Sequence, residues 1–174
     1  MRSSWWSRAR EPIAETLLPA RVVLFAALVP LFLRLCKLPG LPSWVEPRRR
    51  SLPPGPEPRP AEIEALTQRI DELLIAGRPW VRTGCMVRGL TLYRFLRLRG
   101  ADVSLRFGVG TIRGDFAAHC WIVYRGEPLA ESHDPRPLFT ETWRIEPPEP
   151  SPPGPLSRPL PPSLTGRGGE ESLS

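Results

Sequence analysis

The amino-acid sequence predicts an α+β protein in which N-terminal helices pack on an antiparallel β-meander. Two observations carry this prediction. Apolar residues recur at three- and four-residue spacing as far as residue 99, and beyond it they alternate with polar residues at a period of two. The chain of 174 residues includes 24 Pro and 14 Gly, and the prolines bunch into two tracts, so a single domain with tails fits this length better than two packed domains.

The charge and cysteine content narrow the class of protein. Residues 1–60 hold ten Lys/Arg against four Asp/Glu and account for the net charge of +6, whereas residues 61–144 hold twelve against ten. A nearly neutral centre argues against nucleic-acid binding as the main function. Cys36, Cys85 and Cys120 form no CxxC pair, which indicates reduced thiols in the cytoplasm and neither a metal site nor a disulfide scaffold. We expect no cofactor.

Residues 1–47 are expected to form an N-terminal helical segment around an apolar helix over residues 22–33, which Pro30 kinks. This run has twelve residues, whereas a membrane span needs about 20, and no signal-peptide cleavage site follows it. We expect a helix that is buried or lies at an interface. The alternative is a membrane-surface anchor, which Trp5, Trp6 and the flanking arginines would support.

A proline-rich run, residues 48–60, predicts an extended linker, because proline cannot donate the hydrogen bonds of a helix. Pro60 suits the first position of the next helix, which Gly77 and Pro79 end. A further helix is expected over residues 85–99. Its arginines are expected to form a solvated face, and the alternative is a docking surface for an acidic peptide; they are Arg88, Arg94, Arg97 and Arg99.

Three strands are expected after this helix, over residues 103–109, 117–124 and 128–132, with turns at residues 113–115 and 125–127. The core domain is therefore expected to span residues 61–145. Residues 146–174 are rich in Pro, Gly and Ser and predict a disordered tail, because they cannot bury enough area to offset an ordering cost of about 1–2 kcal/mol per residue.

Three side chains could form a cysteine-hydrolase site. Cys85 lies at the start of a helix, where the helix dipole lowers the pKa of a thiol. His119, in an otherwise apolar strand, could take the thiol proton, and the carboxylate of Glu131 could orient the ring. The alternative is that Cys85 and His119 have a purely structural role, as we expect of Cys36 and Cys120. His133 and Asp134 compete with Glu131 for the third position.

The length of the turn between the second and third strands decides whether Glu131 can reach His119. A two-residue turn would set His119 opposite Ser132 and put Glu131 on the other face. A three-residue loop, residues 125–127, would pair Trp121 with Glu131. His119 would then lie diagonal to Glu131 on one face, within side-chain reach, so we expect the longer loop.

Residues 84–100, 105–109 and 118–131 resemble the lasso peptide biosynthesis B proteins, which are transglutaminase-like leader peptidases related to the microcin-processing B protein. The resemblance covers residues 60–135. It implies a papain-like, transglutaminase-like core whose Cys-His-acid triad removes the leader peptide from a ribosomally made precursor. Cys85 and His119 match the nucleophile and the base, and Glu131 stands where the family usually carries Asp.

The same resemblance implies partners. No three-strand, three-helix pattern precedes Cys85, so the chain resembles a stand-alone protease half that needs a separate leader-recognition protein. An asparagine-synthetase-like lasso cyclase, a macrolactam synthetase, would then close the ring of the cleaved precursor peptide. An acyl transferase on the same triad and a non-catalytic peptide-binding scaffold are the alternative functions.

Overall fold

The computed structural model describes residues 16–35, 40–48, 57–78, 80–81 and 84–147. Its elements run in the order α2 (Leu18–Leu35), α3 (Leu41–Val45), α4 (Pro60–Ala76), α5 (Cys85–Leu98), β1 (Val103–Ile112), β2 (Asp115–Tyr124), β3 (Glu127–Pro128) and β4 (Thr140–Ile145). The predicted α+β class, with helices packed on an antiparallel sheet, is confirmed. Some predictions fall outside the described ranges, namely those for Trp5, Trp6, Cys36, Pro79, residues 49–56 and the tail from residue 148 onward.

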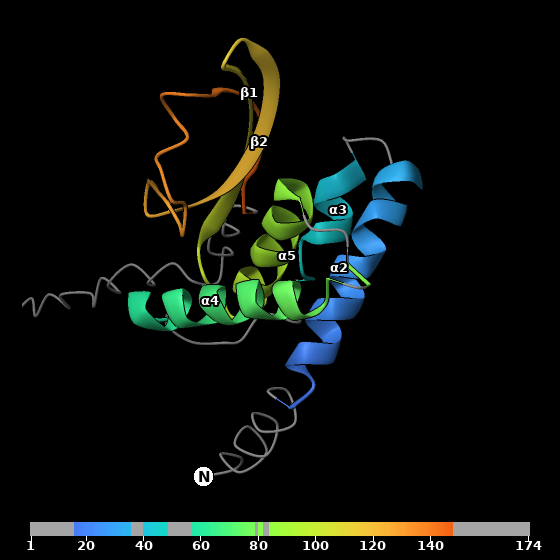
Figure 1. Cartoon of the computed structure of the whole chain (residues 1–174). Helices are drawn as coiled ribbons and strands as arrows, with labels where there is room; N and C mark the ends of the chain where they lie inside the picture. Colours follow the sequence, from blue (N-terminus) through green and yellow to red (C-terminus); the bar gives the residue numbers. More distant parts are fainter. Residues whose placement is uncertain (1–15, 36–39, 49–56, 79, 82–83, 148–174) are drawn as a thin grey trace, which may run out of the picture.

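The sheet has the strand order β3-β2-β1-β4 and is antiparallel throughout. β1 and β2 pair along their full length, from Val103 opposite Tyr124 to Ile112 opposite Asp115, and form a long curved hairpin (Figure 1). The edge strand β4 is an addition to the three predicted strands. The third predicted strand is wrong in extent, because β3 ends at Pro128 instead of reaching residue 132.

Helix α5 lies between the sheet and the helices α2 and α4 (Figure 1). Neighbours on several sides explain why nine of its residues are buried: Val87, Gly89, Leu90, Thr91, Leu92, Tyr93, Phe95, Leu96 and Arg97. Gly89 allows the sheet to come close, since a Cβ at this position would lie 2.9 Å from the Cys120 sulfur. The first turn of α5 is thereby held against the middle of β2.

The arginines of α5 were expected to form a solvated face, and for three of the four this is wrong. Arg94 donates to the backbone oxygens of Trp44 and Val45, both at 3.1 Å. Arg97 is 7% exposed and pairs with Glu46 at 3.1 Å. Both arginines connect the α3 segment to α5, because each guanidinium supplies several hydrogen-bond donors to acceptors of that segment. The third arginine, Arg88, pairs beside the candidate site.

Helix α2 is 18 residues long, six more than the predicted apolar run, and contains Pro30. One face packs on the core through the fully buried Val22, Ala26 and Val29. The outer face exposes leucines to between 44% and 74%: Leu24, Leu28, Leu31 and Leu35. By length and mean hydropathy (1.9) α2 could cross a membrane, although apolar core helices and signal sequences pass the same test.

Candidate active site

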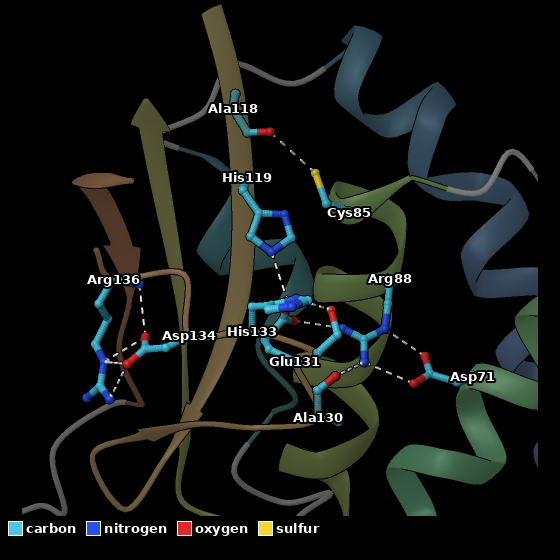
Figure 2. Close-up of polar contacts among 11 residues, drawn as sticks. Asp71, Cys85, Arg88, Ala118, His119, Ala130, Glu131, His133, Asp134 and Arg136 are labelled. Carbon is cyan, nitrogen blue, oxygen red and sulfur yellow. Dashed lines mark hydrogen bonds and ion pairs between the residues drawn. The ribbon is translucent and has the colours of Figure 1, made fainter. Parts of the chain in front are cut away.

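Cys85 is the first residue of α5, and its sulfur faces β2, 4.0 Å from the backbone oxygen of Ala118 (Figure 2). The thiol of Cys120 donates a hydrogen bond to this sulfur, and the backbone N–H of Cys120 and the side chain of His119 add to it. These contacts outweigh the burial of Cys85 and lower its pKa to about 5. The group is therefore a thiolate at neutral pH, which is the nucleophilic form.

The ring of His119 lies between the Cys85 sulfur and the carboxylate of Glu131 (Figure 2). Its Nε2 atom is 3.0 Å from Oε2 of Glu131. Only 26% of the His119 side chain and 12% of the Glu131 side chain are exposed. A carboxylate on Nε2 fixes the ring orientation and leaves Nδ1 on the side of the sulfur, so that a proton can pass between sulfur and ring.

Glu131 reaches His119 by a route that differs from the predicted one. The turn between β2 and β3 has two residues, Arg125 and Gly126, with φ of 51° and 85°, so the expected three-residue loop is wrong. In that register a longer β3 would have put Glu131 on the other face of the sheet. Instead β3 ends at Pro128, and Ala130 has a φ of 53°, which turns the chain and returns Glu131 to the His119 side.

Two aromatic rings pack against His119. The ring centroids of Phe139 and Trp121 lie 5.3 Å and 6.1 Å from that of His119. Phe139 can approach because Gly110 has no side chain: a Cβ at position 110 would lie 2.1 Å from the backbone oxygen of Leu138. Apolar rings beside a charged hydrogen bond exclude water and strengthen it.

Cys120 was expected to be a core thiol, and it is buried, with 2% of its surface exposed. Its contact with the Cys85 sulfur and its burial both raise its pKa far above the ordinary value. Cys120 therefore remains a neutral donor while Cys85 is the thiolate. Sequence reasoning missed this contact, although Cys85 and Gly89, one helical turn apart on α5, form a surface against which a strand thiol can pack.

Arg88 connects the candidate site to α4. Its Nε and Nη2 atoms donate to the two carboxylate oxygens of Asp71, at 2.8 and 2.9 Å. Its Nη1 donates to Oε1 of Glu131 at 3.0 Å, and Nη2 also donates to the backbone oxygen of Ala130 at 3.0 Å (Figure 2). Glu131 is thus bound through one oxygen to His119 and through the other to Arg88.

The two rivals for the third position have other partners. Asp134 accepts hydrogen bonds from the backbone and the guanidinium of Arg136, which lowers its pKa. Nδ1 of His133 lies 3.2 Å from the hydroxyl oxygen of Ser132. Among the described residues, no group of three or more His, Cys, Asp or Glu side chains is placed to hold a metal ion.

A thiolate at a helix N-terminus, an imidazole and a carboxylate lie in line, and such an arrangement can carry out cysteine-dependent acyl transfer. A family model for the transglutaminase-like superfamily matches residues 26–144, and the chain belongs to this superfamily. The superfamily includes cysteine peptidases and acyltransferases. Searches among curated proteins and among solved structures found no match.

Proposed function

We propose that the protein is a cysteine peptidase that removes the leader peptide from a ribosomally synthesised lasso peptide precursor in the cytoplasm. The observation that carries this proposal is the line of sulfur, ring and carboxylate from Cys85 through His119 to Glu131, in a chain of the transglutaminase-like superfamily. The resemblance of residues 84–131 to the lasso peptide biosynthesis B proteins supplies the substrate.

The reaction has two halves, joined by a thioester. The Cys85 thiolate attacks the carbonyl carbon at the junction of leader and core, and the carbonyl electron pair moves onto the oxygen. The C–N bond then breaks, and protonated His119 gives its proton to the leaving amine of the core peptide. Water attacks the thioester, His119 takes one of its protons, and the leader leaves as a carboxylic acid while the thiolate is restored.

Two further groups support this chemistry. The backbone N–H of Cys85 belongs to the first turn of α5 and has no acceptor within the helix, so it is a donor for the oxyanion. A cavity of about 320 Å³ adjoins Gly84, the residue before the nucleophile. Its lining combines apolar and charged side chains: Leu74, Ile75 and Val87 with Asp71, Arg78 and Arg88. The apolar part of this cavity suits an apolar side chain of the substrate near the scissile bond.

The proposal includes two partner proteins. A separate leader-recognition protein presents the precursor, and an asparagine-synthetase-like lasso cyclase uses the amine that cleavage releases. The experiment therefore incubates the precursor and the recognition protein with wild type or Cys85→Ala and follows the products by mass spectrometry. We expect wild type to yield leader and core whose masses sum to that of the precursor plus one water, and Cys85→Ala to yield neither.

A matched variant, Cys36→Ala, removes a thiol to which the proposal gives no role and should cleave as wild type does. Leader removal by Cys85→Ala at the wild-type rate would overturn the proposal. A product in which an added amine replaces the water would show that the site performs acyl transfer. An absence of product, together with a Cys85 thiol that iodoacetamide alkylates no faster than an ordinary thiol near pH 6–7, would favour a binding scaffold.

A further inference from the structure

Three charged side chains, Asp71, Arg88 and Glu131, alternate in sign between α4 and the ring of His119. Asp71 on α4 binds Arg88 through two oxygens, Arg88 binds Glu131, and Glu131 binds His119. The distances are 2.8, 3.0 and 3.0 Å. When His119 carries a proton, the Cys85 thiolate continues the alternation as the fifth charge, so each charge has an opposite neighbour.

Arg88 acts on the orientation of Glu131. A glutamate side chain has three rotatable bonds, and Glu131 follows Ala130, whose φ is 53° and whose segment belongs to no strand. Two hydrogen bonds from one guanidinium, to the backbone oxygen of Ala130 and to Oε1 of Glu131, fix the segment and the carboxylate together. The remaining oxygen, Oε2, then points at His119.

Asp71 makes this arrangement compatible with catalysis. An unbalanced arginine would draw the charge of Glu131 away from His119 and weaken the hold of the carboxylate on the ring. The bidentate ion pair with Asp71 offsets the charge of Arg88 and fixes the plane of its guanidinium. Side-chain exposures of 28% for Arg88 and 30% for Asp71 leave this pair partly shielded from solvent.

We propose that Arg88 is a positioning residue of this active site: it orients the carboxylate of Glu131 on the ring of His119. This inference rests on the proposed peptidase function for its rate effects, and on the site geometry alone for its effect on His119 and the neighbouring thiol. It contrasts with a purely structural role, in which Arg88 would only join α5 to α4 through Asp71.

The test compares Arg88→Met and Arg88→Lys with Asp71→Asn and Glu131→Gln, each checked for folding by circular dichroism. We expect Arg88→Met to lower kcat about 10²-fold, the loss that a small misplacement of a catalytic group causes. Arg88→Lys should recover part of the rate, because an ammonium retains one donor and the charge. Asp71→Asn should cost less than Arg88→Met, since Arg88 can still reach Glu131.

A double-mutant cycle separates the two roles. In the Glu131→Gln background, Arg88→Met should add little further loss, because the carboxylate that it orients is already gone. An equal loss in both backgrounds would overturn the inference and assign Arg88 to the α4–α5 contact alone. If Arg88→Met fails to fold, the same cycle is run with Arg88→Lys.

A measurement that needs no substrate keeps this inference distinct from the proposed function. The rate at which iodoacetamide alkylates Cys85 is followed against pH, with Cys85→Ala as the blank. Arg88→Met should move the midpoint of this curve upward, toward that of an ordinary thiol. A wild type that cleaves no precursor while the midpoint still moves would refute only the peptidase; an unmoved midpoint would refute the role of Arg88.

Discussion

The two ends of α5 carry arginines with similar ion pairs and different neighbours. Arg88, in the first turn, binds Glu131 at 3.0 Å, and Arg97, in the last turn, binds Glu46 at 3.1 Å. Glu46 also accepts a hydrogen bond from the hydroxyl of Tyr93. Burial and this carboxylate raise the pKa of Tyr93. The two ion pairs differ in the second contact that each carboxylate makes: Glu46 contacts a buried phenol, whereas Glu131 contacts the candidate base.

The largest expected effect is at the first-turn end. His119→Ala should lower kcat/KM for precursor cleavage by at least about 10³-fold, because this variant lacks the proposed proton donor to the leaving amine. His133→Ala, which removes the other histidine of the chain, should leave the rate within about 2-fold of wild type. Comparable losses of kcat/KM in both variants would contradict the assignment of His119, beside the first turn of α5, as the reactive histidine.

At the last-turn end, Arg97→Met should reduce the free energy of unfolding by about 3 kcal/mol, because the largely buried Glu46 keeps the hydrogen bond from Tyr93 but loses its cationic partner. The kcat of the molecules that remain folded should not change. Urea denaturation gives the first quantity, and active-site titration followed by a cleavage assay gives the second. A drop in kcat without loss of stability would reverse the division of roles between the two ends.

The depressed pKa of Cys85 predicts how its reactivity depends on pH. Alkylation of Cys85 by iodoacetamide should have its midpoint near pH 5, and at pH 6 it should exceed that of an ordinary thiol by at least about 10-fold. The folded-state pKa lies below the unfolded one. The thiolate therefore contributes stability fully above the unfolded pKa of about 8.5 and loses it as the pH falls through about 5. A midpoint near pH 8.5 would contradict the site geometry.

The smallest expected effect comes from Cys120→Ala. Removal of the thiol that donates to the Cys85 sulfur should move the alkylation midpoint upward from about pH 5 and lower kcat by less than about 10-fold. The backbone N–H of residue 120 and the ring of His119 remain in place in this variant. A complete loss of cleavage with a normal circular dichroism spectrum would show that the Cys120 side chain has a larger role than that of a hydrogen-bond donor.

Much of the fold could be predicted from local patterns. The three- and four-residue spacing predicted α4 and α5, and alternation predicted β1. An apolar run between two turns, interrupted only by His119, predicted most of β2. The edge strand β4 was missed because most of its residues are exposed and polar, and only Trp143 and Ile145 supply an apolar alternation toward the core. Strand β3 was predicted too long, since the sequence does not show that Ala130 takes a positive φ.

The residues of the candidate site could be chosen from the sequence, but their connections could not. The two-residue turn at Arg125 and Gly126 was missed for two reasons. One glycine suits a loop of either length, and nothing in the local sequence indicates that Arg125 adopts a left-handed φ. Arg88 was assigned to solvent because its partners Asp71 and Glu131 lie 17 and 43 residues away, outside the spacing at which helical neighbours can be read.

Cys85 lies on helix α5, whereas His119 lies on strand β2 and Glu131 follows β3. These two residues reach Cys85 only after the sheet has packed against α5. An unfolded chain consequently holds an ordinary cysteine, and the acidic thiol appears only once tertiary structure has formed. Brief labelling at mildly acidic pH then counts the native molecules in a sample, so that Cys85 itself reports on folding.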